Sequence, residues 1–185
     1  MDDCLFFCKD DSKIDAVLKN LREEEKLELT EEKDVFAFLG VTYKAHGFGV
    51  DKEIELTQTG LIQKILRTTG MTECNGKRTP ANTEPLGTDC HGAQCIYDWD
   101  YASVIGMMMY LSSNSRPEIQ FAVHQCARFT HCPKHSHELA ILRICRYLKG
   151  TQEKGLLFKP TKNLQLDCYV DADFAGLYNV ERVDN

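Results

Sequence analysis

The sequence predicts an α+β fold, with a strand pair, a set of amphipathic helices and then the first strands of a further unit. Apolar residues recur at helical spacing in residues 14–21 and again in residues 101–149. Residues 54–57 and 164–171 instead alternate apolar with polar side chains, the period of a strand. Since 43% of the residues are hydrophobic, the chain can bury a core.

The first elements follow a pair of aspartates, Asp2 and Asp3. The apolar run 4–8 has the length of a strand, and residues 9–12 form a polar turn. The next helix has an apolar face made by Ile14, Val17, Leu18 and Leu21. Ser12 is placed to cap this helix, with Asp15 three residues later.

Residues 36–43 and 54–57 predict a pair of strands, because they are rich in aromatic, β-branched and alternating residues. A short helix over residues 59–68 should end at Gly70. Residues 72–98 are polar and contain three prolines or glycines in the span 80–87, so they predict a long loop.

Three helices should follow the loop, over residues 101–112, from Ser115 onward, and over 136–149. Ser115 before Pro117 and Glu118 is a pattern typical of a helix N-terminus. The expected core residues of the last two helices are Ile119, Ala122, Val123, Cys126, Leu139, Leu142, Cys145 and Leu148. Gly150 ends the third helix, and residues 155–158 and 164–171 predict two strands.

The net charge of −6 is unevenly distributed. Glutamates dominate residues 23–32, whereas most of the charged residues in 116–162 are Lys or Arg. Any contact with a phosphate backbone is therefore expected in the later half. Nine cysteines without an export signal predict free thiols in a reducing, intracellular compartment, with Cys126, Cys145 and Cys168 at apolar positions. No apolar run is long enough for a membrane span.

Two groups of carboxylates could bind Mg²⁺. Asp2 and Asp3 precede an apolar strand, and Asp171 and Asp173 stand at the end of another. Adjacent carboxylates of this kind hold the ions of two-metal phosphoryl transfer. The alternatives from the residues alone are a solvated N-terminus for the first pair and turn capping for the second.

A third group has the residue types of a zinc site. Its members are His124, Cys126, His131, Cys132, His135 and His137. The group contains no Cys-x₂-Cys pair, so two helix ends that carry histidines are the simpler interpretation. A zinc-stabilised structural protein remains an alternative.

Taken in order, these segments resemble one family. Met1-Asp2-Asp3-Cys4-Leu5-Phe6-Phe7 resembles the end of the Tyr-Val-Asp-Asp motif of copia-type long-terminal-repeat retrotransposon reverse transcriptases, with Met1 in place of Val. Residues 38–41, 54–58 and 61–66 resemble the segment after that hairpin. Residues 101–106, 109–111, 115–119 and 146–151 resemble the stretch that leads into ribonuclease H, and 171–176 its first strand and turn.

The resemblance implies a partial reverse-transcriptase palm with a β-hairpin in residues 1–70, a linker in 71–100, a helical thumb-like region in 101–152 and the start of a ribonuclease H-like domain in 153–185. Asp2 and Asp3 would be catalytic polymerase carboxylates, and Asp171 the first nuclease carboxylate, all three as Mg²⁺ ligands. A thumb tracks the template–primer backbone, which implies nucleic-acid contacts for Arg143, Arg146 and Lys149.

The same resemblance implies missing parts. The upstream metal-binding aspartate, the fingers and the remaining nuclease carboxylates are not in this sequence, and two-metal catalysis needs a full set of ligands. The chain alone is therefore expected to be inactive and to bind no Mg²⁺ tightly. Its expected partners are an RNA/DNA template–primer and other parts of the Pol polyprotein, and no membrane. A remnant that binds nucleic acid or a polymerase without catalysis is the other alternative.

Overall fold

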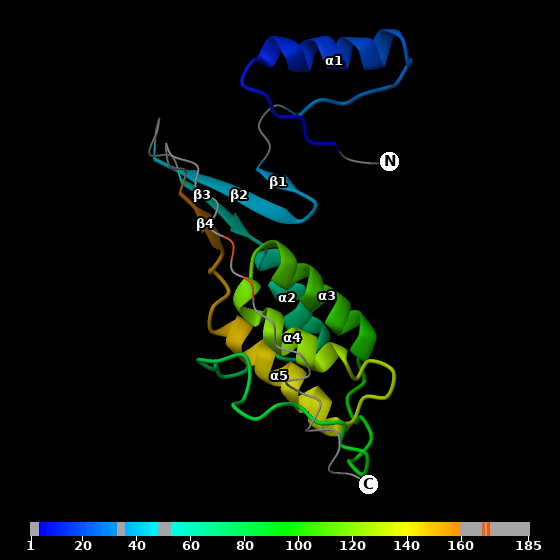
Figure 1. The fold of residues 1–185 in the computed structure, drawn as a ribbon, viewed down its shortest axis with the longest axis vertical. Helices are drawn as coiled ribbons and strands as arrows, with labels where there is room; N and C mark the ends of the chain where they lie inside the picture. Colours follow the sequence, from blue (N-terminus) through cyan, green and yellow to red (C-terminus); the bar gives the residue numbers. More distant parts are fainter. Residues whose placement is uncertain (1–3, 33–35, 48–52, 160–167, 169, 171–185) are drawn as a thin grey trace.

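The computed structural model describes residues 4–32, 36–47, 53–159, 168 and 170. These residues form five α-helices and a four-stranded antiparallel sheet. In Figure 1, α1 lies at one end, the sheet lies in the middle, and helices α2–α5 form the other end. The mixed α and β content that the sequence predicts is confirmed.

Helix α1 spans Asp11–Glu23 and buries none of its residues. Its cap is Asp10, whose carboxylate accepts hydrogen bonds from the Ser12 backbone N–H at 3.1 Å and from the Ser12 hydroxyl at 2.6 Å. The prediction that Ser12 caps the helix is therefore wrong by two residues, because the cap is Asp10, which lies just outside the helix and accepts from Ser12. On the apolar side of α1, Ile14, Leu18 and Leu21 are half-buried, and Val17 is exposed.

The sheet has the order β1-β2-β3-β4, with every neighbouring pair antiparallel. Its strands are β1 (Ala37–Phe38), β2 (Val41–His46), β3 (Glu53–Thr57) and β4 (Leu156–Phe158). The single strand predicted over residues 36–43 is wrong, since a hairpin turn divides it. Leu39 and Gly40 have φ values of 49° and 75°, and two-residue hairpins of the type with both φ values positive match the twist of their strands.

The two faces of the sheet differ in polarity. Residues opposite one another in the register share a face, so one face carries Tyr43, Ala45, Ile54, Leu56, Leu156 and Phe158. The other face carries polar side chains, including the pair His46 and Glu55 at 3.1 Å. Strand β4 was expected to be the first strand of the ribonuclease H-like unit. It instead pairs with β3 and extends the sheet of residues 37–57.

The core lies among the helices. These are α2 (Thr59–Thr68), α3 (Tyr101–Asn114), the 3₁₀ helix η2 (Pro117–Ile119), α4 (Gln120–Ala127) and α5 (His135–Lys149). Ile62 and Ile65 of α2 belong to the same buried cluster as Met108 of α3, Val123 of α4 and Ile144 of α5. The helix at the end of the predicted palm segment therefore packs with the predicted thumb-like helices.

Two expectations about these helices were wrong. Ser115 does not cap a helix: its hydroxyl donates to Gln58 Oε1 at 2.8 Å, and η2 precedes α4. Leu139 is 49% exposed, whereas Leu142, Cys145 and Leu148 are buried as predicted. The reason is helical geometry, because Leu139 lies on the same side of α5 as Arg143, four residues later.

The predicted loop after α2 is confirmed. Gly70 follows α2 with φ of 68°, and residues 71–100 contain no helix and only an isolated bridge between Gln94 and Lys134. The strand predicted over 164–171 lies outside the described residues, except for Cys168 and Val170. None of the helices in the described part of the chain combines the length and apolarity that crossing a bilayer requires.

Candidate nucleic-acid interface

The predicted metal ligands are four aspartates. Asp2, Asp3, Asp171 and Asp173 all lie outside the described residues. The predicted nucleic-acid contacts, in contrast, lie on α5 and can be examined in detail.

Helix α5 positions Arg143, Arg146 and Lys149 at successive three-residue steps, so that they line one side of its last turns. Arg143 Nη2 donates to the Thr79 hydroxyl at 2.8 Å. Arg146 is exposed and Lys149 is half-buried. A helix C-terminus also favours cations, because its unpaired carbonyl groups carry partial negative charge.

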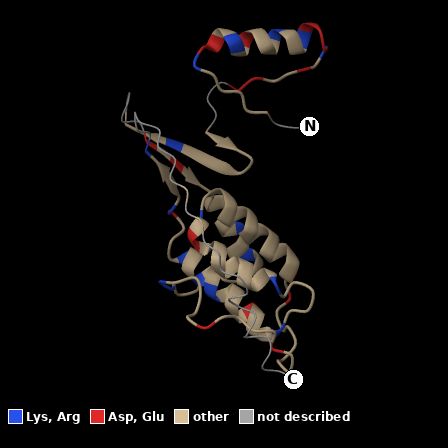
Figure 2. Cartoon of the chain, viewed as in Figure 1, with Lys and Arg blue, Asp and Glu red and all other residues tan. Residues whose placement is uncertain are grey.

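The loop after α2 brings two more cations to this side of α5. Lys77 N–H donates to the Arg146 carbonyl at 3.1 Å, and a Cβ atom on Gly76 would lie 3.1 Å from the Gly150 Cα. This close approach places exposed Lys77 and Arg78 beside α5. We call Lys77, Arg78, Arg143, Arg146 and Lys149 the basic surface; Figure 2 shows Lys and Arg gathered at this part of the helical region.

None of the five cations of the basic surface forms an ion pair with a carboxylate in the described part of the chain. The ion pairs of the described residues lie elsewhere, for example Lys19 with Glu23 in α1 and Lys159 with Glu53 at the sheet. Sequence reasoning missed Lys77 and Arg78, because only the packing of the loop on α5 brings them there. The result is a concentrated positive patch on a chain with a net charge of −6.

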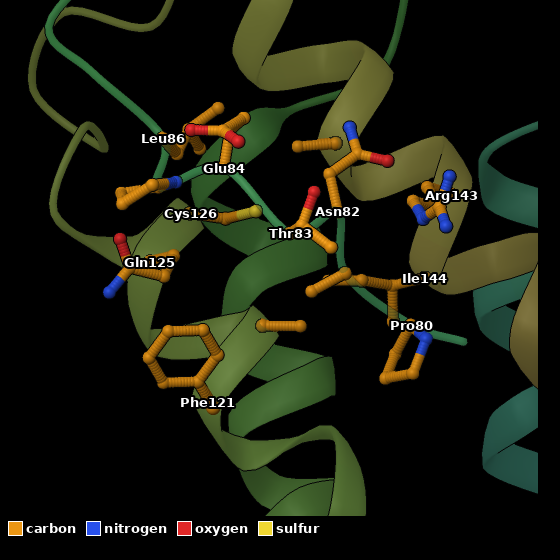
Figure 3. Close-up of a pocket in the computed structure, with 14 residues that line it drawn as sticks. Pro80, Asn82, Thr83, Glu84, Leu86, Phe121, Gln125, Cys126, Arg143 and Ile144 are labelled. Atoms are coloured by element: carbon orange, nitrogen blue, oxygen red, sulfur yellow. The ribbon is translucent and has the colours of Figure 1, made fainter.

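A cavity of about 80 Å³ adjoins the basic surface, where residues 80–86 cross α4 and α5. Its walls are largely apolar, with Phe121, Ala122 and Ile144 among them, and Arg143 lies at its edge (Figure 3). The Arg143 Nε atom is buried and has no hydrogen-bond partner among the described residues. A buried donor without an acceptor is rare in proteins and requires an explanation.

A buried polar junction fixes the C-terminal end of α5, and with it Lys149. Arg116 is 1% exposed, and its guanidinium donates to Glu118 Oε1 at 2.7 Å, to the Thr151 carbonyl at 3.0 Å and to the Thr151 hydroxyl at 2.6 Å. The guanidinium also lies 5.7 Å from the centre of the Tyr147 ring. These contacts join the α3–α4 connection to the chain just after α5.

The N-terminal end of α5 is fixed by the buried carboxylate of Glu138. Glu138 is 2% exposed and accepts hydrogen bonds from the backbone N–H groups of Ile96 and Tyr97 at 2.9 and 3.1 Å, with His135 Nδ1 at 3.1 Å. Burial by itself would raise the pKa of Glu138. The hydrogen bonds from Ile96, His135 and Tyr97 outweigh it and hold the pKa below its ordinary value of 4.5.

The histidines and cysteines predicted as an alternative zinc site do not form one. Within the described residues, which include all six candidates, no three His, Cys, Asp or Glu side chains come close enough to hold a metal. His137 is fully buried, with Nδ1 accepting from the Lys134 N–H at 2.9 Å and Nε2 against the Gly87 carbonyl at 2.9 Å. Its ring stacks on Phe129 at 4.1 Å, so it is a satisfied core histidine.

The described cysteines are free, as the sequence predicts. Cys126 and Cys145 are buried, and burial raises the pKa of each thiol to about 12. Cys168, expected at an apolar position, is exposed instead.

Comparison with known proteins identifies the family. The chain is 30% identical over 176 residues to the retrovirus-related Pol polyprotein from transposon RE1 of Arabidopsis thaliana, and 30% identical over 152 residues to that from transposon RE2. The chain belongs to the copia-type transposon Pol polyproteins. It spans 12% and 10% of the length of these two relatives, which cover 95% and 82% of the chain.

A shorter relative of the transposon-derived chain is an uncharacterized mitochondrial protein of Arabidopsis thaliana, 30% identical over 148 residues, or 59% of its length. No protein-family model matches the transposon-derived chain, and no solved structure matches it.

Proposed function

We propose that this chain is the part of a copia-type reverse transcriptase and ribonuclease H that contains the catalytic aspartates Asp2 and Asp3 and the segment after them, and that its basic surface binds the backbone of an RNA/DNA template–primer. The observation that carries the proposal is the convergence of Lys77, Arg78, Arg143, Arg146 and Lys149 from two segments on one side of α5. Cations that neutralise phosphates release condensed counterions, so such a surface gives strong binding at low salt.

Rigidity supports the same proposal. The positions of the cations are set by α5, whose two ends are held by the buried carboxylate of Glu138 and by the Arg116 junction. A preorganised row of cations loses less side-chain freedom on binding than cations on a mobile loop. The family relationship supports a nucleic-acid partner in general. The residues that we propose to contact it are those of the basic surface.

In the intact polyprotein, Asp2 and Asp3 would supply two Mg²⁺ ligands for polymerisation, and Asp171 one for the nuclease. Because each two-metal site requires further carboxylates, the 185-residue chain is proposed to catalyse neither reaction by itself. A primer-extension assay in Mg²⁺ tests this part. Synthesis that is lost in Asp2→Asn would contradict it.

Fluorescence anisotropy with a labelled RNA/DNA hybrid tests the basic surface. We expect binding in about 50 mM salt that weakens steeply as salt rises, and a double variant, Arg146→Ala with Lys149→Ala, that lowers the slope of log K against log salt by about 2, since each lost phosphate contact removes about 1. The control replaces Lys13 and Lys19 of the distant helix α1 by Ala and should change the slope little. Equal loss in both double variants would refute a localised interface.

A further inference from the structure

The cavity beside the basic surface has the size of one aliphatic side chain. Its volume of about 80 Å³ is roughly half that of a ~150 Å³ cavity that accepts benzene, which suits a small aliphatic group. Its walls come from Phe121 and Ala122 of α4, Ala140 and Ile144 of α5, and Leu86 of the loop (Figure 3). Phe121 is 62% exposed and extends the apolar wall to the surface.

Arg143 lies at the edge of the cavity and forms no ion pair within the described residues. Arg143 Nε is buried without a partner among the described residues, and its guanidinium continues into the basic surface. A buried N–H of a charged group that lacks an acceptor costs about 1–3 kcal/mol or more. An occupant that fits both features therefore combines an aliphatic side chain with a carboxylate next to it.

One described segment of this chain has that combination. Residues 23–32, which we call the acidic segment, contain the glutamates Glu23, Glu24, Glu25, Glu28, Glu31 and Glu32. Within it, Leu27 is 50% exposed and is followed directly by exposed Glu28. Residues 26–32 form no helix or strand, so they can adopt an extended course along a groove. Glu31 is paired with Arg22, whereas Glu28 forms no ion pair within the described residues.

We propose that the acidic segment of a second copy of this chain docks on the basic surface, with Leu27 in the cavity and Glu28 against Arg143. A second copy is the occupant because the acidic segment follows α1 at one end of the molecule, while the cavity lies among α4 and α5 at the other end, beyond the sheet (Figure 1). If two copies exchange these segments, each contact is made twice about a two-fold axis. The self-association then uses the surface that the proposed function assigns to nucleic acid.

Sedimentation velocity of the full chain tests this interaction. We expect a concentration-dependent dimer at low salt that dissociates at 0.5 M salt, because the contact is electrostatic at its rim. Leu27→Ser should weaken dimerisation at least tenfold. Val17→Ser is the matched control, since it removes a 45% exposed apolar side chain from neighbouring α1 and should leave the dimer unchanged.

A charge exchange identifies the partner residues. Glu28→Lys and Arg143→Glu should each weaken the dimer, and the double variant should recover it, because a reciprocal contact restores the pair in both copies. Circular dichroism checks that each variant folds. If Arg143→Glu does not fold, a labelled peptide of residues 22–32 replaces it, and we expect it to bind the unchanged chain while the Leu27→Ser peptide does not.

Three results would overturn the proposal: a monomer at every concentration and salt, equal effects of Leu27→Ser and Val17→Ser, or a double charge exchange that recovers nothing. If the acidic segment covers the cavity in a monomer, the chain folds its own segment back onto itself, and this result also overturns the proposal. Hybrid binding is measured on the same variants. A chain that dimerises but binds no RNA/DNA hybrid would refute the proposed function and leave this interaction standing.

Discussion

Replacing Arg116 by Ala should destabilise the helical region by about 3 kcal/mol. Arg116 is 1% exposed and makes three hydrogen bonds between 2.6 and 3.0 Å long, all of them charge-assisted. Bonds to charged groups contribute about 1.5–3 kcal/mol each, and removing one partner of a buried ion pair costs about 3–5 kcal/mol. The expected cost lies at the lower end of the range of about 3–5 kcal/mol, because the Glu118 side chain is 40% exposed and water can solvate it in the variant.

Urea unfolding measures the change. The single tryptophan, Trp99, lies next to the N-terminus of α3 and packs against the core, so its fluorescence reports on the helical region, with far-UV circular dichroism as a second probe. Arg146→Ala is the control, since this exposed arginine should change the free energy of unfolding by less than about 0.5 kcal/mol. Arg116→Lys should recover little, because an ammonium group cannot reproduce the three directed bonds.

A double-mutant cycle with Thr151→Val separates the bonds to the hydroxyl from packing. We expect a coupling energy of about 1 kcal/mol or more between the two positions, since the Arg116 guanidinium contacts Thr151 directly. The reasoning fails if Arg116→Ala costs less than about 1 kcal/mol with an unchanged denaturant slope, or if the two substitutions are additive.

Three further predictions concern buried groups. Glu138→Gln should reduce the acid sensitivity of folding, because the pKa of Glu138 in the folded chain lies below 4.5 and the stability that its carboxylate contributes is lost as the pH falls through that folded pKa. Urea unfolding midpoints measured from pH 6 to pH 3 should therefore vary less in the variant. Iodoacetamide at pH 8 should modify exposed Cys90 and Cys132 but leave Cys126 and Cys145 unmodified in the folded chain, because burial raises their pKa to about 12; mass spectrometry after digestion detects this, and rapid labelling of Cys145 would contradict the buried placement. Tyr101→Phe should cost about 1 kcal/mol in urea, because the hydroxyl donates to the buried Cys126 carbonyl at 2.9 Å, whereas Tyr97→Phe at a 39% exposed ring should cost almost nothing.

The sequence by itself determined the family and most of the elements. The ordered motifs from Asp2 to Asp171 indicated a copia-type Pol polyprotein, and the relatives confirm it. Helical periodicity located α1, α2, α3 and α5 because an amphipathic helix repeats its apolar side chains every three to four residues. Strand β3 was found for the same local reason, its alternation of apolar and polar residues.

The tertiary structure decided what local pattern cannot encode. Leu39 and Gly40 form a turn inside a segment that reads as one strand, and Leu139 faces solvent although its spacing fits the core. Lys77 and Arg78 join the basic surface only because the Gly76–Gly150 approach brings their loop to α5, across some 70 residues of sequence. Likewise, β4 pairs with β3 about 100 residues earlier. Contacts between distant segments depend on packing and hydrogen-bond partners that no short window of sequence contains, and the candidate interface is built from such contacts.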